Sequence, residues 1–188
     1  STETELEKNC NIYAKLVGIN GQSTVATGTV KNIDKLNPKV FTPTATSTNT
    51  TITVDASTTD AEATSDNASS GIYGYRFKQG NGTWTAYQKG GNYTFTGLTK
   101  NTNYTITVEA KDNAGNTTTG TVAIKTKNTY TVSYNSNGGT GAPASQTKIQ
   151  GTNITLSTQI PTRDGYEFKG WGTSSNATTI AYNAGDTY

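Results

Sequence analysis

The sequence contains no histidine and a single cysteine, Cys10. Without histidine the chain lacks the commonest general base and the commonest metal ligand. One cysteine cannot build a disulfide framework, and without histidine it cannot supply the usual zinc ligand sets. We therefore interpret Cys10 as a small strand residue rather than a reactive thiol.

Charge and apolar residues are also scarce. Charged residues make up 15% of the 188 residues, hydrophobic residues 31%, and the formal net charge is +2. So small a charge gives no electrostatic basis for binding nucleic acid or an anionic membrane. No apolar run approaches the roughly 18 residues of a membrane-spanning helix. We expect no nucleic-acid partner and no direct membrane insertion.

Much of the remaining sequence is threonine, asparagine, glycine and serine. This composition is typical of short strands joined by polar turns. A chain this polar could be disordered, but 11 tyrosines, 4 phenylalanines and 2 tryptophans argue against it, because disordered segments are poor in aromatic residues. The composition predicts a mainly β protein.

The segment from Leu98 to Val122 carries the clearest pattern. Apolar residues alternate from Tyr104 to Ala110, which is the period of a half-buried strand, and a turn over 112–116 leads into a second strand. A weaker copy of this block, from Leu6 to Val30, lies 92 residues earlier. An offset of that size is one sandwich domain, so the chain resembles a piece of a tandem array.

The copy places two strands at about 11–17 and 24–33, joined by a turn that contains Asn20-Gly21. We predict that residues 1–34 are the C-terminal hairpin of a preceding, partial sandwich-like unit. A lone hairpin is marginal in water, so its edge would need cover from elsewhere. The alternative is an N-terminal extension of the domain that follows.

Residues 35–127 contain seven candidate strands with turns at regular spacing, which favours a β-sandwich. The candidates are 40–44, 50–56, 71–77, 84–88, 93–95, the strand from Tyr104 and the strand that ends near Ile124. We assign Tyr73, Tyr75 and Phe77 to the core, on one face of the third strand. If 83–88 is a regular strand, Trp84 and Tyr87 face opposite ways.

Leu98 and Tyr104, followed by the alternating strand, resemble the tyrosine corner of fibronectin type III domains. A second pattern is similar to that of bacterial immunoglobulin-like modules. It consists of Ser70-Gly71-Ile72 with Tyr75, then Trp84, then Asp112-Asn113-Ala114-Gly115-Asn116. The resemblance implies a seven-stranded sandwich in which Tyr104 buries its ring and bonds back to the backbone.

Residues 128–188 differ in character. Four short runs have the spacing of a known repeat. They are Tyr130-Thr131-Val132, Asn137-Gly138-Gly139, the run from Pro161 to Trp171 and the run from Tyr182 to Thr187. They resemble the Listeria–Bacteroides repeat, the B repeat of internalin-type surface proteins. The resemblance implies a small β-grasp-like unit in which Tyr166 and Trp171 are structural, and it implies a further strand after the last residues shown.

Nothing in the sequence predicts catalysis, a cofactor or an established metal site. Loops at one end of a sandwich can converge, so we consider calcium at Asp55, Asp60, Asp66 and Asp112, although a solvated acidic loop is the favoured interpretation. Trp84 is the candidate for a sugar-facing aromatic. Lys111 and Lys125 are candidates for an isopeptide link, but both sit at strand ends.

We expect a non-enzymatic stalk or spacer of a bacterial cell-surface or secreted repeat protein, extracellular and related to adhesion. Its partners would be neighbouring domains of the same polypeptide and an unknown protein or glycan on host or neighbouring cells. The alternative is a carbohydrate- or host-protein-binding accessory module of a secreted enzyme. A phage-tail or spore-coat component with the same modules is a third hypothesis.

Overall fold

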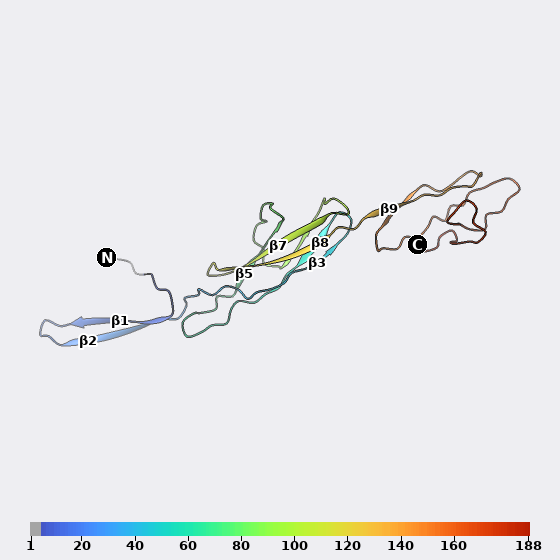
Figure 1. Cartoon of the computed structure of the whole chain (residues 1–188). Helices are drawn as coiled ribbons and strands as arrows, with labels where there is room; N and C mark the ends of the chain where they lie inside the picture. Colours follow the sequence, from blue (N-terminus) through green and yellow to red (C-terminus); the bar gives the residue numbers. More distant parts are fainter. Residues whose placement is uncertain (1–4) are drawn as a thin grey trace. The chain divides into compact units, whose positions relative to one another are not determined.

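A computed structural model describes residues 5–188, which form strands, turns and loops without any helix (Figure 1). Within this range, therefore, no helix is long and apolar enough to cross a membrane. Several small sheets account for the regular structure. The prediction of a mainly β fold is confirmed.

Two three-stranded sheets make up the sandwich. The first has the order β3-β4-β6, and the second has the order β5-β7-β8. The strands are β3 (Thr44–Ser47), β4 (Ile52–Asp55), β5 (Ile72–Gln79), β6 (Asn92–Phe95), β7 (Asn103–Asp112) and β8 (Thr117–Lys125). The pair β7–β8 is the hairpin that the alternating pattern and the turn at 112–116 predict.

The core contains the alternate residues of these strands. Phe77 of β5 and Val108 of β7 are fully buried and lie opposite each other in the antiparallel register. Phe77 also stacks on Tyr93 of β6, with ring centroids 5.4 Å apart. Other buried apolar side chains are Ile52, Val54, Tyr75, Ile106 and Ala110. Large rings and β-branched residues thus fill an interior that has few other apolar side chains.

Two of the seven strands predicted for residues 35–127 are absent. At 40–44 the chain is irregular, and β3 begins only at Thr44, because Pro43 has no N–H for a sheet ladder. The segment 84–88 follows the edge of β5 without becoming a strand. It makes one bridge, in which Tyr75 and Gln88 exchange two N–H to carbonyl bonds of 2.8 Å.

The core assignment is confirmed for Tyr75 and Phe77 and is wrong for Tyr73, whose side chain is 43% exposed. The register of β5 against β7 shifts between Ile72 and Gly74. Such a bulge inserts one residue and reverses the side on which the preceding side chain lies. Strict alternation therefore places Tyr73 on the wrong face.

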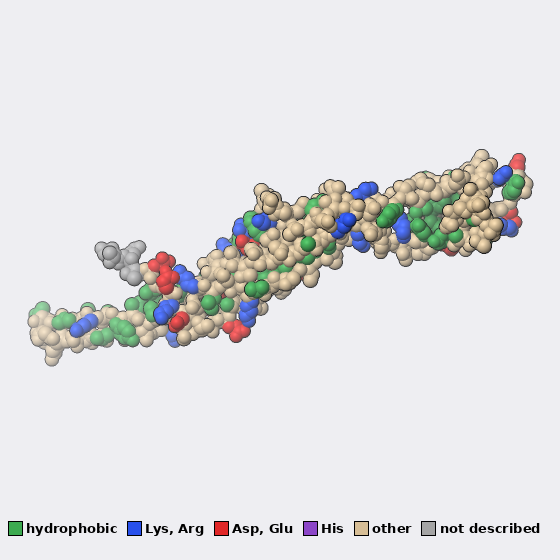
Figure 2. Space-filling model, in the orientation of Figure 1, with side chains coloured by type: hydrophobic (Ala, Val, Ile, Leu, Met, Phe, Trp, Pro, Cys, Tyr) green, Lys and Arg blue, Asp and Glu red, His purple; other side chains and the backbone are tan. Residues whose placement is uncertain are grey.

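The predicted N-terminal hairpin is confirmed. Its strands β1 (Cys10–Val17) and β2 (Ser23–Val30) are antiparallel, and Cys10 pairs with Val30 (Figure 1). The second strand ends at Val30 rather than Ile33. Hydrophobic side chains of the hairpin are exposed, and Figure 2 shows them along it; they include Ile12, Tyr13, Leu16, Val17 and Val25. The two strands bury little apolar surface between them.

The C-terminal repeat has little regular structure. Strands β9 (Thr129–Val132) and β10 (Gln146–Ile149) form an antiparallel pair. Isolated bridges hold the remainder, including one between Trp171 and Tyr182. Side-chain contacts rather than long ladders therefore determine the position of the later residues.

The described residues divide into two compact units. One contains the residues up to Thr46, Thr53–Phe95 and Asn103–Ile124, and the other contains Ser47–Ile52, Thr96–Thr102 and Lys125–Tyr188. Tyr104 is half-buried at the start of β7 in the first unit. Leu98 is half-buried in the second, where its N–H donates to the Thr50 carbonyl at 2.9 Å.

Candidate functional site

Three buried aspartates meet at one place in the first unit. Carboxylate oxygens of Asp34, Asp60 and Asp112 lie within 4.8 Å of one another. Their exposed fractions are 7%, 8% and 0%. We call this group the aspartate junction, because its members come from the segment after β2, the loop after β4 and the end of β7.

The structure thus brings together two of the four calcium candidates and adds one that the sequence did not indicate. Asp55 and Asp66 are exposed and lie outside the junction. The expectation of a solvated acidic loop is wrong for Asp60 and Asp112, which are buried. Asp34 was missed because the sequence placed it in a different module from Asp60 and Asp112. No spacing rule links residues so far apart in the chain.

Backbone donors satisfy the junction. Asp112 accepts bonds from the N–H groups of Gly115 (2.6 Å) and Asn116 (2.8 Å). Asp60 accepts from the N–H groups of Ala61 (2.9 Å) and Gly71 (2.7 Å). Asp34 accepts from the N–H groups of Leu36 (3.0 Å) and Ser70 (2.8 Å). The bond from Ser70 joins the loop after β4 to the segment after β2, and Asn116 Nδ2 joins the turn that follows Asp112 to the same segment by donating to the Asp34 carbonyl at 3.3 Å.

The pKa of the Asp34 carboxyl is lowered. Burial by itself raises this pKa, but hydrogen bonds to Ser70 and Leu36, and one shared with Asp60, outweigh the burial. An oxygen-only donor set is the kind that Ca²⁺ takes. All six carboxylate oxygens of the junction already accept hydrogen bonds, so these bonds account for the burial without a cation. A calcium site stays a prediction.

A second group of side chains covers the face of β5 and β7 that points away from the core. It alternates cations and rings in the order Lys78, Trp84, Arg76, Tyr87, Lys111, Tyr73, Lys89. The distance from each cation to each adjoining ring centroid is between 4.7 Å (Arg76 to Trp84) and 5.2 Å (Lys111 to Tyr73). We call this set the aromatic–cation face.

Trp84 and Tyr87 lie on the same side of the sheet, contrary to the expectation for a regular strand. The Arg76 guanidinium is 4.7 Å from the Trp84 ring centroid and 4.8 Å from that of Tyr87. Because the segment that carries both rings is irregular, the period of two does not apply to it. Trp84 is half-buried in this arrangement.

Glu109 is the carboxylate at the centre of the face. Its Oε1 accepts a bond from Arg76 Nε at 2.7 Å and one from the Tyr87 hydroxyl at 2.5 Å. The hydrogen bond to Glu109 raises the pKa of Arg76. Burial, followed by the same carboxylate, raises the pKa of Tyr87 to about 12. The centre of the face is therefore a fixed charged network rather than a set of free surface side chains.

The three lysines of the face have no carboxylate partner among residues 5–188. Lys89 donates to the Tyr73 carbonyl at 2.7 Å, and Lys111 lies over the rings of Tyr73 and Tyr87. With Arg76 paired to Glu109, the surplus charge of the face is positive. Lys111, a candidate for an isopeptide link, thus contacts two aromatic rings.

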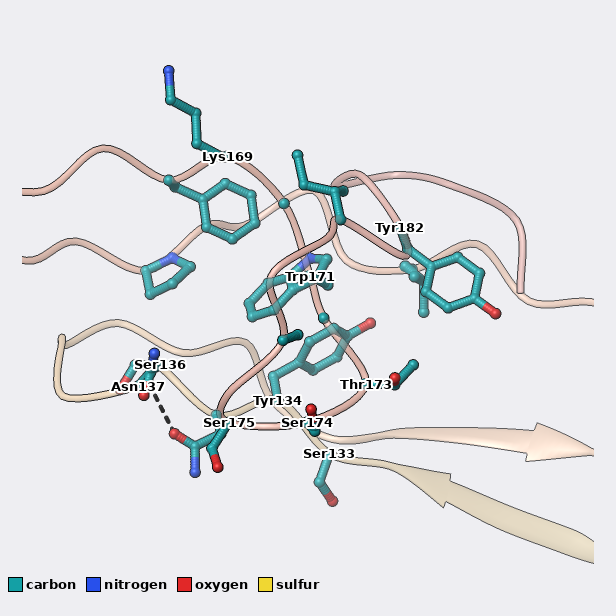
Figure 3. Close-up of a pocket in the computed structure, with 18 of the residues that line it drawn as sticks. Ser133, Tyr134, Ser136, Asn137, Lys169, Trp171, Thr173, Ser174, Ser175 and Tyr182 are labelled. Atoms are coloured by element: carbon teal, nitrogen blue, oxygen red, sulfur yellow. Dashed lines mark hydrogen bonds between the residues drawn. The ribbon is translucent and has the colours of Figure 1, made fainter.

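The C-terminal repeat encloses an open cavity of about 830 Å³ (Figure 3). Trp171 lies in the middle of it beside Tyr134, with ring centroids 4.9 Å apart. The Phe168 ring centroid is also 4.9 Å from that of Trp171. Hydroxyl groups of Ser133, Ser136, Thr173, Ser174 and Ser175 are among its lining. The aromatic cluster of the repeat is therefore incompletely enclosed.

Trp171 is half-buried, but its Nε1 atom is buried and has no hydrogen-bond partner. Among residues 5–188, every other buried side-chain nitrogen or oxygen of a residue that is not exposed has a partner. Tyr134 contrasts with Trp171, because its hydroxyl donates to Gln146 and accepts from the Ser157 N–H at 2.9 Å. Tyr166 is 69% exposed and lies under Arg163, 4.2 Å from the guanidinium carbon to the ring centroid.

Residues 130–188 match the family model of the Listeria-Bacteroides repeat domain. This part of the chain contains such a repeat, as its motifs predict. Repeats of this family occur in bacterial surface or secreted proteins, and the family is not an enzymatic one. No curated protein matches the chain.

Proposed function

We propose that this chain is a non-enzymatic spacer segment of a bacterial cell-surface or secreted protein that takes part in adhesion. The observation that carries the proposal is the Listeria-Bacteroides repeat at 130–188. In the proposed organisation, residues 1–34 are the hairpin of a partial unit, 35–127 are a fibronectin III or immunoglobulin-like sandwich, and 128–188 are the repeat.

The sandwich supports this reading through its two three-stranded sheets and shared apolar core. A tyrosine corner at Tyr104 is part of the proposal: the ring packs at the strand start and the hydroxyl bonds to backbone. Short connections such as 35–38 and 128–129 leave little freedom between successive modules, which suits a spacer.

X-ray scattering of the full chain in solution tests the spacer. A compact protein of this length has a radius of gyration of about 16 Å, and an unfolded one about 46 Å. Modules arranged in series predict a value well above the compact one, together with a far-ultraviolet spectrum of folded β structure. A compact radius with the same spectrum would contradict the spacer.

A second candidate function is glycan binding by an accessory module. The specific observation in its favour is the aromatic–cation face, where Tyr73, Trp84 and Tyr87 lie together on one sheet. Rings on one face of a sandwich are suited to contacts with sugar faces. Binding of any glycan by the full chain on a glycan array would support this function, and a blank array would remove it.

A further inference from the structure

We propose that the aromatic–cation face binds an acidic polysaccharide, so that uronate or similar acid groups contact its lysines and a sugar face contacts the exposed ring of Tyr73. The inference rests on the second candidate function and names its ligand class. It does not depend on the spacer function.

The face has a surplus of positive charge that the protein does not neutralise. Arg76 has the Glu109 carboxylate at 2.7 Å, whereas Lys78, Lys89 and Lys111 have no carboxylate partner among the described residues. The whole chain has a net charge of only +2. Three unpaired cations on one face are therefore a local feature, complementary to a row of anionic groups.

One end of the face offers both a cation and an exposed ring to a polymer of acidic sugars. Two cations lie within 5.2 Å of each ring centroid along the face, and at this end Lys89 lies over Tyr73. Tyr73 is 43% exposed because of the bulge at Ile72–Gly74, and Lys89 is exposed as well. A ligand can therefore reach both a ring and a cation at this end.

The network around Glu109 gives the face a fixed shape. Glu109 holds Arg76 at 2.7 Å and the Tyr87 hydroxyl at 2.5 Å, and its side chain is only 11% exposed. The Arg76 guanidinium in turn lies over the rings of both Trp84 and Tyr87. Side chains that are ordered before binding lose less conformational entropy when a ligand arrives.

Single-stranded nucleic acid also binds through rings and cations, but the face suits it less. Successive bases of a single strand stack on successive aromatic side chains. Here Tyr73 is the exposed ring of the face, whereas Trp84 and Tyr87 are half-buried with cations over their rings. One exposed ring can contact a single sugar, but it does not offer a row of rings for stacked bases.

The test measures binding of the full chain to polygalacturonate and to its fully methyl-esterified form, in calcium-free buffer at low salt. The acid polymer should bind, and the affinity should fall as sodium chloride is raised. The ester, which keeps the sugar and removes the charge, should bind at least about tenfold more weakly. Equal binding of both polymers would overturn the acid assignment and leave neutral-glycan binding in place.

Matched triple variants locate the site. K78Q/K89Q/K111Q removes the three unpaired lysines of the face, and K8Q/K15Q/K31Q removes three exposed lysines elsewhere in the same compact unit. Both lower the net charge equally. We expect about a tenfold loss of polygalacturonate binding for the first and little change for the second. Equal losses would show that net charge alone is responsible and would overturn the site.

Three further outcomes bear on the proposal. Y73A removes an exposed ring without opening the core, and it should weaken polygalacturonate binding while the melting temperature stays close to that of the wild type. Tighter binding of an oligothymidylate than of polygalacturonate would overturn the polysaccharide assignment. Absence of binding to any acidic glycan would overturn the inference and leave the scattering test of the spacer unaffected.

Discussion

Arg76 of β5 and Glu109 of β7 lie directly opposite each other, and the guanidinium Nε is 2.7 Å from the carboxylate Oε1. The side chains are 30% and 11% exposed. A cross-strand pair this shielded is screened less by solvent than a surface pair. The same carboxylate holds Tyr87, so the pair organises the outer face of the sheet.

A double-mutant cycle with R76M and E109Q should give a coupling free energy of about 1–2 kcal/mol in urea unfolding. The control is the exposed pair Glu167–Lys169, whose cycle should give less than about 0.5 kcal/mol. A coupling near zero for Arg76 and Glu109 would show that the pair does not stabilise the sheet.

The Tyr87 phenol should ionise only at high pH. Its pKa is raised to about 12, first by burial and then by Glu109, so spectrophotometric titration should show one phenol deprotonating well after the exposed tyrosines. Y87F should remove that late component, and E109Q should move it to lower pH. Because the folded pKa is above the unfolded value of 10.0, the stability it contributes is present below pH 10 and is lost as pH rises towards 12.

Asp34 should make the protein sensitive to acid. Its folded pKa lies below the unfolded value of 3.8, so its contribution to stability is present above that pH and is lost as pH falls through the folded pKa. Urea midpoints measured from pH 7 to pH 3 should fall less steeply for D34N than for the wild type. D66N is the control, since Asp66 is exposed and lies 3.9 Å from Lys8. Parallel curves for D34N and wild type would contradict the role of the junction.

Tyr134 and Trp171 should respond differently to substitution by phenylalanine. Y134F removes a hydroxyl that makes two hydrogen bonds and should destabilise the repeat by about 1–2 kcal/mol. W171F removes a buried N–H that has no partner, which offsets the lost ring contacts, and should change stability by less than about 1 kcal/mol. A larger loss for W171F than for Y134F in thermal unfolding would show that the indole N–H is satisfied in solution.

Gly91 should not tolerate a side chain. A Cβ at this position would overlap the carbonyl oxygen of Ala56, and the Gly91 carbonyl accepts the Ala56 N–H at 2.9 Å. G91A should therefore destabilise the sandwich by about 2 kcal/mol or more. G90A is the neighbouring control, since the nearest atom to its Cβ would be 3.6 Å away. Equal chemical-denaturation midpoints for the two variants would show that the loop can move aside.

The local sequence pattern was enough to predict the hairpins and the repeat. Alternation from Tyr104 to Ala110 and the turn at 112–116 predict β7 and β8, because the period of two and the turn chemistry are properties of adjacent residues. The copy at Leu6–Val30 predicts β1 and β2 in the same way. The fixed spacing of glycine and aromatic residues likewise identifies the repeat at 130–188.

The alternation of apolar and polar residues predicted side-chain positions wrongly where one residue changes the register or where the chain leaves the sheet. The bulge at Ile72–Gly74 exposes Tyr73, and the irregular segment 84–88 brings Trp84 and Tyr87 to the same side. Both effects arise from contacts with a neighbouring segment. Lys111 of β7 lies opposite Gly74, and Gln88 forms a bridge with Tyr75. A single-strand alternation rule contains no information about those neighbours.

The sequence by itself determined that this chain is all-β, that residues 10–30 form a hairpin and that residues 130–188 are a Listeria-Bacteroides repeat. Only the tertiary structure decided which polar residues meet: Asp34 with Asp60 and Asp112, and the lysines with the rings of the outer face. The physical reason is distance along the chain. Strand and turn preferences act over a few residues, whereas these clusters form from segments that only the packed sheets bring together.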